Sequence, residues 1–137
     1  MSAAPEGFQP FRHSSPFLDR IGPLYERTDA HGLTLGVRVE PWHCNRRGLC
    51  HGGLMVTLGD IVLGYTAGPL AEPGSSLTTV HLSTDFAGGA GLGDWLEARA
   101  DVQKAGGSLA FANAYISNNG LRIVRVSGVF KVAKRNR

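Results

Sequence analysis

One segment of this 137-residue chain is apolar on every side of a helix. Residues 53–67 read GLMVTLGDIVLGYTA. A helix that is hydrophobic all round has to be buried. The sequence offers no second long helix that could cover it, so the sequence predicts a sheet that curls around it. We expect Gly59 and Gly64 to allow close packing of strands, because each glycine weakens a helix by about 1 kcal/mol.

Alternating apolar and polar residues predict the strands of that sheet. Residues 33–40 alternate and form a predicted hairpin with Tyr25–Thr28 through residues 29–32. After the helix, four antiparallel strands are predicted over residues 79–86, 95–102, 108–117 and 121–132, with Asn118-Asn119-Gly120 as a tight turn between the last two. The fold class is therefore α+β, with one long buried helix wrapped by a curved antiparallel sheet of about five to six strands.

The chain divides into an arm and one domain. Residues 1–24 form the predicted N-terminal arm, loose over residues 1–16, with a short helical turn at Phe17–Ile21 that Gly22-Pro23 ends. Residues 25–137 form a single domain with a basic C-terminal tail. A length of 137 residues suffices for one core.

The net charge of +3 is concentrated at the C-terminus. Lys131, Lys134, Arg135 and Arg137 lie in the last seven residues, so the rest of the chain carries a net charge of −1. Basic and aromatic residues do not interleave elsewhere, which argues against nucleic-acid binding. The apolar run near residues 54–67 is too short and interrupted to span a bilayer. No signal sequence precedes the two cysteines, so we expect a cytoplasmic protein without a membrane partner.

The stretch WHCNRRGLCHGG, residues 42–53, raises the question of a metal site. Structural zinc sites use four ligands, usually with two cysteines separated by two to four residues, and the pairs His43-Cys44 and Cys50-His51 do not fit. Adjacent side chains in extended backbone also point to opposite sides. We therefore predict no metal and interpret both cysteines as small apolar residues.

Asp60 is the only charged residue in the apolar helix. An unpaired buried carboxylate costs several kcal/mol, so this side chain needs a partner, a proton or access to solvent. A structural aspartate bonded to backbone or to an arginine is one interpretation. A functional acid is the interpretation we favour.

The start of the helix carries His51-Gly52-Gly53. The first N–H groups of a helix lack intrahelical partners and attract anions and polarised oxygens. An N–H of Gly52 or Gly53 could hold a carbonyl oxygen and activate its carbon. Asp60 lies eight residues after Gly52, about 12 Å along the axis. A catalytic site using both would need a second subunit.

These residues together resemble the hot-dog-fold acyl-CoA thioesterases. The motif consists of Asn45, His51-Gly52-Gly53, Asp60 in an apolar helix, and Thr79-Val80-x-Leu82, followed by a four-strand tail. It is similar to the phenylacetate-pathway and 4-hydroxybenzoyl-CoA branch, which includes mammalian members, and it covers roughly residues 25 to 132. The resemblance implies hydrolysis of acyl-CoA to acid and CoA, without a cofactor other than the CoA of the substrate.

The resemblance also implies roles and an assembly. Asp60 would be the nucleophile or the general base, Gly52 would donate its N–H to the thioester oxygen, and Asn45 and His51 would shape the site. Thr79, or Thr78 in its place, would position water. Two subunits would pair edge to edge and share the sites, as a dimer or a dimer of dimers. Candidates for binding the substrate are Gly53, Arg46, Arg47, His81, Lys104, Gly107 and Ser108, the last two within Gly106-Gly107-Ser108.

Two rival interpretations use the same fold, and a third, a subunit with a role in assembly alone, would leave Asp60 unexplained. Dehydratases and hydratases carry a histidine and an acid at other spacings, which this sequence does not match. A non-catalytic acyl-CoA-binding module would be marked by loss of the helix acid, and Asp60 is present. The nature of the acyl group is left open by the sequence.

Overall fold

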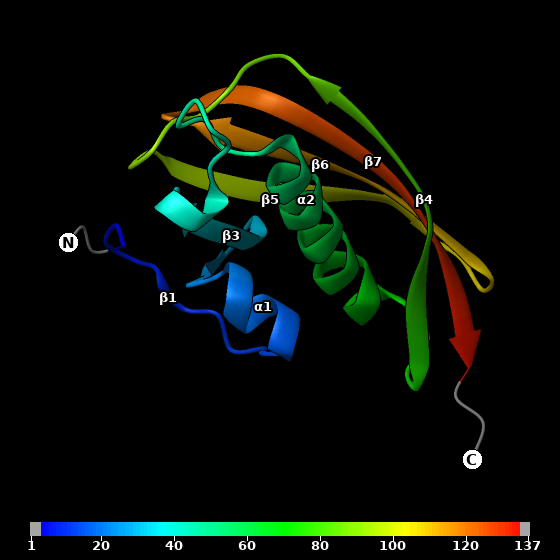
Figure 1. Ribbon diagram of the computed structural model, residues 1–137. Helices are drawn as coiled ribbons and strands as arrows, with labels where there is room; N and C mark the ends of the chain where they lie inside the picture. The colour runs from blue at the N-terminus through cyan, green and yellow to red at the C-terminus, as the bar shows by residue number, and fades with distance from the viewer. Residues whose placement is uncertain (1–3, 135–137) are drawn as a thin grey trace.

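The computed structural model describes residues 4–134 and shows a curved antiparallel sheet packed on one long helix (Figure 1). The seven strands have the order β1-β2-β3-β5-β6-β7-β4. The helix, α2, lies against the concave side of the sheet. The sheet curves around α2 without closing into a barrel. The elements are β1 (Gln9–Pro10), α1 (Pro16–Ile21), β2 (Tyr25–Asp29), β3 (Gly32–Arg38), η1 (Pro41–His43), α2 (Gly52–Ala67), η2 (Gly68–Leu70), β4 (Ser75–Phe86), β5 (Trp95–Ala105), β6 (Leu109–Asn118) and β7 (Leu121–Lys134).

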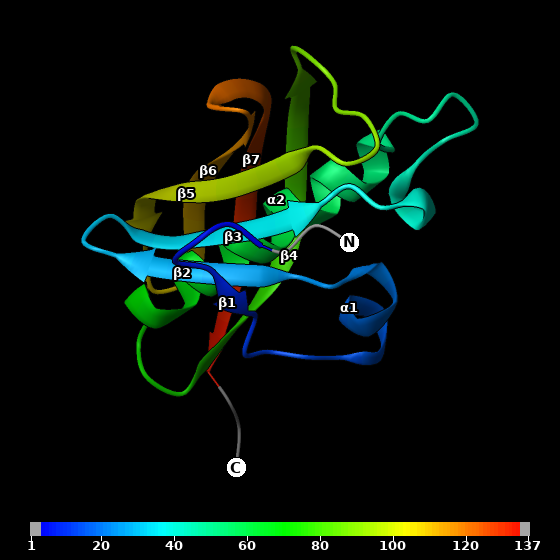
Figure 2. The ribbon, with the colours of Figure 1, turned by 90° about the vertical axis from the view of Figure 1, so that its left-hand side faces the viewer.

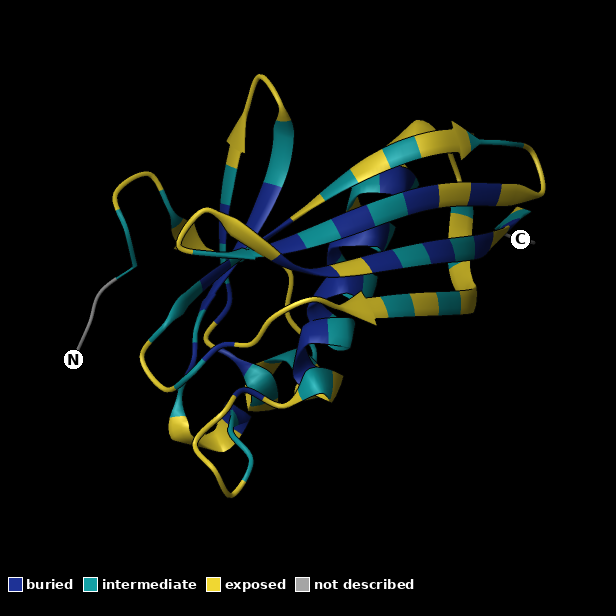
Figure 3. Cartoon of the chain, turned by 90° about the horizontal axis from the view of Figure 1, so that it is seen from above, coloured by how far each residue is buried: buried dark blue, intermediate teal, exposed yellow. Residues whose placement is uncertain are grey.

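The predicted order of strand, helix and four strands is confirmed, with one strand more than expected because β1 joins the sheet. The β6–β7 turn lies where the sequence placed it. Asn119 has φ 52° and Gly120 has φ 81°. Both are in the left-handed region that a tight two-residue hairpin requires. Figure 3 shows the alternation of buried and more exposed residues along the strands, as expected for a sheet with one covered face.

The helix α2 is covered on one side only, which corrects the expectation that it is buried all round. The residues facing the sheet are buried: Leu54, Met55, Leu58, Gly59, Val62, Leu63 and Ala67. On the other side, residues Gly53, Val56, Asp60, Ile61, Gly64 and Tyr65 are half-buried or exposed. We call these six residues the open face of α2. The sheet curves around half of the helix, and an apolar surface is left without cover in the single chain.

The two glycines in the middle of α2 have different surroundings. A Cβ atom on Gly59 would lie 2.6 Å from Cγ2 of Val126 in β7, so glycine there allows the close packing that the sequence predicted. A Cβ atom on Gly64 would meet nothing within 4 Å. The prediction of close packing is confirmed for Gly59 and wrong for Gly64, which lies on the open face.

The N-terminal arm is ordered over its described residues, so the expectation of a loose segment is wrong. β1 pairs with β2, and the N–H of Phe11 donates to the Leu24 carbonyl (Figure 2). The Glu26 side chain is 1% exposed and accepts hydrogen bonds from the Arg12 backbone N–H and guanidinium. The predicted helical turn is α1, whose N-terminus is capped by Ser15. The arm therefore belongs to the folded unit.

Two expectations about the ends and the membrane change with the structure. Lys131 and Lys134 lie in β7, not in a tail, whereas Arg135 and Arg137 lie outside the described residues. The stretch Gly52–Leu70 has 19 residues and a mean hydropathy of 1.2, which is long and apolar enough to cross a membrane by those measures. Its buried residues, which include Leu54, Met55, Leu58 and Leu63, pack on the sheet, as those of a core helix do. The cytoplasmic location stays a prediction.

Candidate functional site

Asp60 and Thr79 form the polar centre of the open face. The Thr79 hydroxyl donates a hydrogen bond to Oδ1 of Asp60 at 2.7 Å. The two side chains come from the middle of α2 and from β4, 19 positions apart in the sequence. Thr79, which the resemblance implied as a water-positioning residue, thus lies beside Asp60. Because Thr79 occupies one carboxylate oxygen, the second oxygen is available for a water molecule or a substrate.

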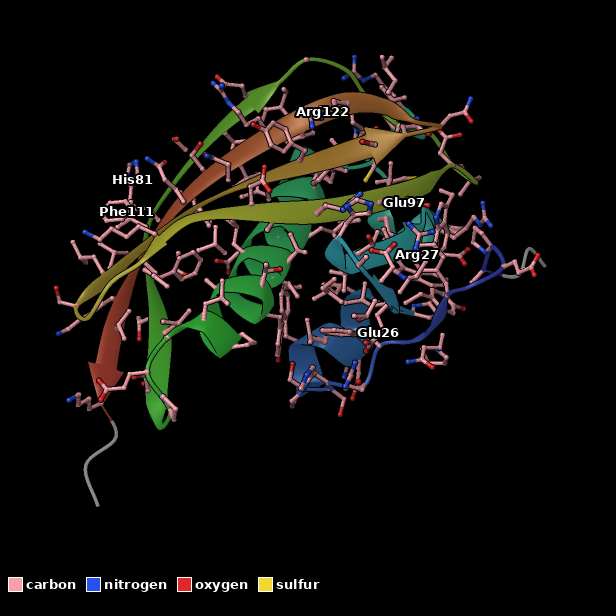
Figure 4. All side chains as sticks on the ribbon, turned by 180° about the vertical axis from the view of Figure 1, so that it is seen from behind. Glu26, Arg27, His81, Glu97, Phe111 and Arg122 are labelled. Atoms are coloured by element: carbon pink, nitrogen blue, oxygen red, sulfur yellow. The ribbon has the colours of Figure 1, made fainter. Side chains whose placement is uncertain are left out.

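A bulge in β4 aims Thr79 at the helix. Thr79 pairs with Phe130 of β7, and His81 pairs with the adjacent residue Val129, so Val80 is left over. Directly paired residues point to the same side of a sheet, and adjacent residues point to opposite sides. Thr79 therefore shares the inner side with buried Phe130, and His81 points outward. Strict alternation would put Thr79 and His81, two positions apart, on the same face, and the bulge separates them. Figure 4 shows His81 and Phe111 on the outer side of the sheet.

The start of α2 has the geometry of an oxygen-binding end. His51 is the N-cap residue, and in the described structure its side chain makes no capping hydrogen bond. The N–H groups of Gly52 and Gly53 belong to the first turn of α2 and have no intrahelical acceptor. A Cβ atom on Gly53 would meet nothing within 4 Å. Both N–H groups therefore lie at a helix end that an oxygen atom can approach from the Gly53 side.

Phe86 is a residue of this region that sequence reasoning missed. Its ring would lie 3.2 Å from a Cβ atom on Gly52. The side chain comes from the end of β4 and is 52% exposed. The alternating pattern indicated only that Phe86 points inward. Phe86 lies over the start of α2 because β4 runs along the helix and ends there. The residues near Phe86 in the sequence do not indicate this path of β4.

Gly52 and Asp60 lie in one continuous helix, as expected. Eight residues at 1.5 Å each separate them by about 12 Å. A single carbonyl group cannot contact both within one chain. Two sizeable hollows, of about 830 and 560 Å³, are lined by neither residue. The geometry of one chain thus provides two halves of a site at a distance from each other.

The segment before α2 is a tight loop held by Asn45. Its Oδ1 atom accepts hydrogen bonds from the N–H groups of Arg47, at 2.9 Å, and Leu49, at 3.1 Å. Cys44 and Cys50 pair through their backbones as an isolated antiparallel β-bridge across this loop, and both thiols are free. Asn45 therefore shapes the loop that leads into His51. The side chain of Asn45 binds the loop backbone, and its role in shaping the site stays a prediction.

The histidine and cysteine pairs of the loop have structural partners. Nδ1 of His43 accepts from the Glu40 N–H at 2.9 Å, and Nε2 contacts the Ile21 carbonyl. Burial and the neighbouring Cys44 raise the pKa of Cys50 to about 11, so this thiol stays protonated. Within residues 4–134, no three His, Cys, Asp or Glu side chains are grouped to hold a metal ion.

The basic candidates for binding CoA lie in two separate places. Arg46 and Arg47 are exposed in the loop, which bridges to Gly91 just before β5. Lys104 lies at the end of β5, and Gly107 and Ser108 form the turn after it. The 11 residues of β5 extend over about 33 Å. One chain does not bring the two groups together, and their roles stay predictions.

One family model and two relatives are similar to this chain in sequence. The model of the thioesterase superfamily matches residues 47–124, more than half of the chain. The chain is 44% identical over 131 residues to "Putative esterase PA0474" of Pseudomonas aeruginosa, covering 95% of this chain and 98% of that protein. It is 32% identical over 86 residues to acyl-coenzyme A thioesterase 13 of Mus musculus, covering 63% and 61%.

Solved structures share the fold. Zebra fish thioesterase superfamily member 2 superposes with a TM-score of 0.76 at 29% identity, over 85% of this chain and 87% of that one. The BH2602 protein of Bacillus halodurans, solved with CoA, gives a TM-score of 0.79 at 21% identity, over 93% and 83%. The predicted hot-dog fold is thereby confirmed, and the chain belongs to the thioesterase superfamily.

Proposed function

We propose that this protein hydrolyses acyl-CoA thioesters, with Asp60 as the group that activates water. The observation that carries the proposal is the Thr79–Asp60 hydrogen bond on the open face of α2. It places a carboxylate on a surface that is otherwise apolar and uncovered. The similarity to a mouse acyl-coenzyme A thioesterase supports the choice of reaction and substrate. The structure of the Bacillus halodurans protein with CoA supports a CoA thioester as ligand.

The proposed reaction needs only residues of this chain and water. The free oxygen of Asp60 takes a proton from water while the water oxygen bonds to the thioester carbon. The Gly52 N–H stabilises the negative charge that develops on the carbonyl oxygen. The carbon–sulfur bond then breaks, the thiolate takes up the proton that Asp60 received from water, and acid and CoA leave with Asp60 again a carboxylate. A thiolate leaves without strong acid help, so His51 is not required as an acid.

The proposed site lies between two subunits. β4 is the last strand of the described sheet, and its other edge is unpaired there over 12 residues. Long unpaired edges are normally covered. Pairing of two β4 edges around a two-fold axis would cover both and bring the open faces of two α2 helices together. Asp60 of one subunit would then meet Gly52 of the other, which resolves the 12 Å separation.

The test of the proposal compares Asp60→Asn with a matched aspartate. Asp85 lies on β4, the strand that carries Thr79; its side chain points outward and forms an ion pair with Arg125 of β7. Asp60→Asn keeps the shape and should lower kcat by roughly 10² to 10⁴ on the best CoA ester, whereas Asp85→Asn should change it little. Thiol release measured with a disulfide reagent reports kcat. A folded Asp60→Asn protein that turns over within a few-fold of wild type would refute the role of Asp60.

Binding without turnover in the wild-type protein would favour the second candidate, a non-catalytic acyl-CoA-binding module. Calorimetry with the same esters separates the two outcomes. A single turnover in H₂¹⁸O distinguishes the two roles of Asp60. Water attack places ¹⁸O in the released acid, and attack by Asp60 itself places ¹⁸O first in the carboxylate of the protein.

Hybrid subunits test the shared site. Gly52→Pro removes one N–H at the first helical position, where proline fits the backbone. Asp60→Asn and Gly52→Pro proteins should each be nearly inactive. Exchange of their subunits should restore activity, because one of the two sites in each mixed dimer keeps both groups. Confirmed exchange without recovery would refute a site between subunits.

A further inference from the structure

The two cysteines of the chain lie directly opposite each other at the base of the loop before α2. Cys44 and Cys50 are the partners of an isolated antiparallel β-bridge. Two backbone hydrogen bonds flank the pair, one on each side: from the Asn45 N–H to the Leu49 carbonyl at 2.8 Å, and from the His51 N–H to the His43 carbonyl at 2.9 Å. The backbones of the two cysteines are thus held face to face from both sides.

This pattern of hydrogen bonds fixes the distance between the two cysteines. Cys44 and Cys50 do not bond to each other; their N–H groups donate to the carbonyls of Pro41 and Ala90. In an antiparallel pair, residues that lie opposite each other without a mutual hydrogen bond have Cα atoms about 4.5 Å apart, and their side chains lie on the same face. Disulfides join residues whose Cα atoms are roughly 4.4–6.8 Å apart. The backbone therefore already has the spacing that a disulfide requires.

Both thiols are free and have only weak hydrogen bonds. Sγ of Cys44 donates to the Glu40 carbonyl at 3.4 Å, and Sγ of Cys50 donates to the His51 carbonyl at 3.7 Å. A thiol is a weak donor, so little is lost when either sulfur leaves its carbonyl. Rotation of each side chain about χ1, between staggered positions, turns the two sulfurs toward each other.

The two thiols differ in their access to solvent. Cys44 is half-buried, whereas Cys50 is 6% exposed. Burial and, as the smaller cause, the neighbouring Cys44 raise the pKa of Cys50 to about 11, so the Cys50 thiol is protonated and reacts poorly with a reagent from solution. A small soluble oxidant therefore reaches and oxidises Cys44 first.

We propose that Cys44 and Cys50 are a site of reversible oxidation by hydrogen peroxide, at which an intramolecular disulfide closes the loop of residues 45–49. The Cys44 sulfur attacks one peroxide oxygen, the O–O bond breaks, and Cys44 becomes a sulfenic acid while one water leaves. The Cys50 sulfur then displaces the hydroxyl group, which takes the Cys50 proton and leaves as a second water. The two thiols lose two electrons and two protons, and the peroxide is reduced to water.

The consequence of the disulfide is protection of the loop that leads into α2. Cys50 lies two positions before Gly52, and the new bond joins residues whose backbones are already paired, so the start of the helix stays in place. Without Cys50, the sulfenic acid of Cys44 would proceed to sulfinic acid, which thiols do not reduce. The proposal concerns the chemistry of the loop and does not depend on the proposed hydrolysis.

The experiment treats folded wild type, Cys44→Ala and Cys50→Ala with hydrogen peroxide, alkylates the remaining thiols after denaturation, and measures intact mass and peptide masses. Wild type should lose two hydrogen atoms and both reactive thiols, and dithiothreitol should restore them. Cys50→Ala should instead gain two oxygen atoms at Cys44, as a sulfinic acid. Cys44→Ala is the matched control and should keep the Cys50 thiol. Cys50→Ser, which is closer in size, replaces Cys50→Ala if that protein does not fold.

Thermal unfolding of the oxidised protein gives a second measurement. Closing the loop should raise the Tm of wild type by about 5–10 °C over the reduced form, and peroxide should leave the Tm of Cys44→Ala unchanged. A Tm that falls when the disulfide forms would show that the native loop lacks the geometry of a disulfide and would overturn the proposal. Wild type in which Cys44 stays a thiol, Cys44 gains oxygen atoms while Cys50 stays a thiol, or the disulfide joins two chains would overturn it too.

Discussion

Gly59 and Gly64 allow the packing of α2 to be tested with one kind of substitution. Both lie inside the same helix, so Gly→Ala should contribute about 1 kcal/mol of helix propensity at each position. At Gly64 the new methyl group meets nothing within 4 Å. Gly64→Ala should therefore raise the free energy of unfolding by about 0.5–1 kcal/mol.

At Gly59 the same methyl group has no room. It would lie 2.6 Å from Cγ2 and 2.9 Å from Cβ of Val126, which is fully buried. Insertion of a methyl group into a packed core costs about 1–3 kcal/mol. The gain in propensity offsets part of this cost, so Gly59→Ala should be less stable than Gly64→Ala by about 1–3 kcal/mol. For a chain of 137 residues, each 1 kcal/mol corresponds to roughly 3–5 °C in Tm.

Urea unfolding at one fixed protein concentration measures the difference, since association would make stability depend on concentration. The double variant Gly59→Ala/Val126→Ala should recover part of the loss, because the second change removes the colliding methyl groups. Equal stability of the Gly59→Ala and Gly64→Ala proteins, or absence of coupling between Gly59 and Val126, would refute the packing argument.

Three further predictions concern other parts of the molecule. The Arg12 hydrogen bond lowers the pKa of Glu26 below its usual value, so the contribution of the Glu26 carboxylate to stability is complete at neutral pH and is lost as pH falls through the lowered pKa. Glu26→Gln should reduce the loss of stability at acid pH, measured by unfolding at a series of pH values. An unchanged pH profile would contradict this. Gly52→Ala should lower kcat moderately, since its methyl group crowds Phe86, and Phe86→Leu should restore part of the activity if crowding is the cause. Elemental analysis should find no stoichiometric zinc, and a chelator should leave thioester hydrolysis unchanged; one zinc per chain with loss of activity would contradict this.

The fold could be predicted because the patterns that encode it are local. Alternation with period two fixed the strands, and one uniformly apolar segment required a sheet around it. Asn119-Gly120 identified its hairpin from two residues. Each of these signals lies within a few positions of the element that it describes, so one sequence suffices to read it.

The bulge in β4 could not be predicted by the same reasoning. Strict alternation would put Thr79 and His81 on one side of β4 and Val80 on the other. The pairing with β7 leaves Val80 over and turns Thr79 toward Asp60. A bulge depends on the register against another strand, here 51 positions away for Thr79 and Phe130. Thr79 was proposed by resemblance to a family, and its orientation toward Asp60 came only from the structure.

Apart from Asp60, the open face of α2 carries only uncharged residues, so sequence could not separate it from the buried face. Val56, Ile61 and Gly64 are as apolar as the residues that pack on the sheet. An apolar helix face is covered either by its own chain or by something else, and hydrophobicity alone does not say which. The coverage depends on how far the sheet curves.

The structure replaces the reason for which Asp60 became the candidate acid. Asp60 was singled out because a charge in a dry helix is costly. The carboxylate that is almost fully buried is that of Glu26, and it has the Arg12 hydrogen bonds that such a group requires. Asp60 is only half-buried and has one hydrogen bond from Thr79. A carboxylate with one oxygen held and one oxygen free can reach water and substrate, whereas a fully paired one cannot. Accessibility on an apolar face, more than the cost of burial, is what distinguishes the candidate catalytic acid from the structural one.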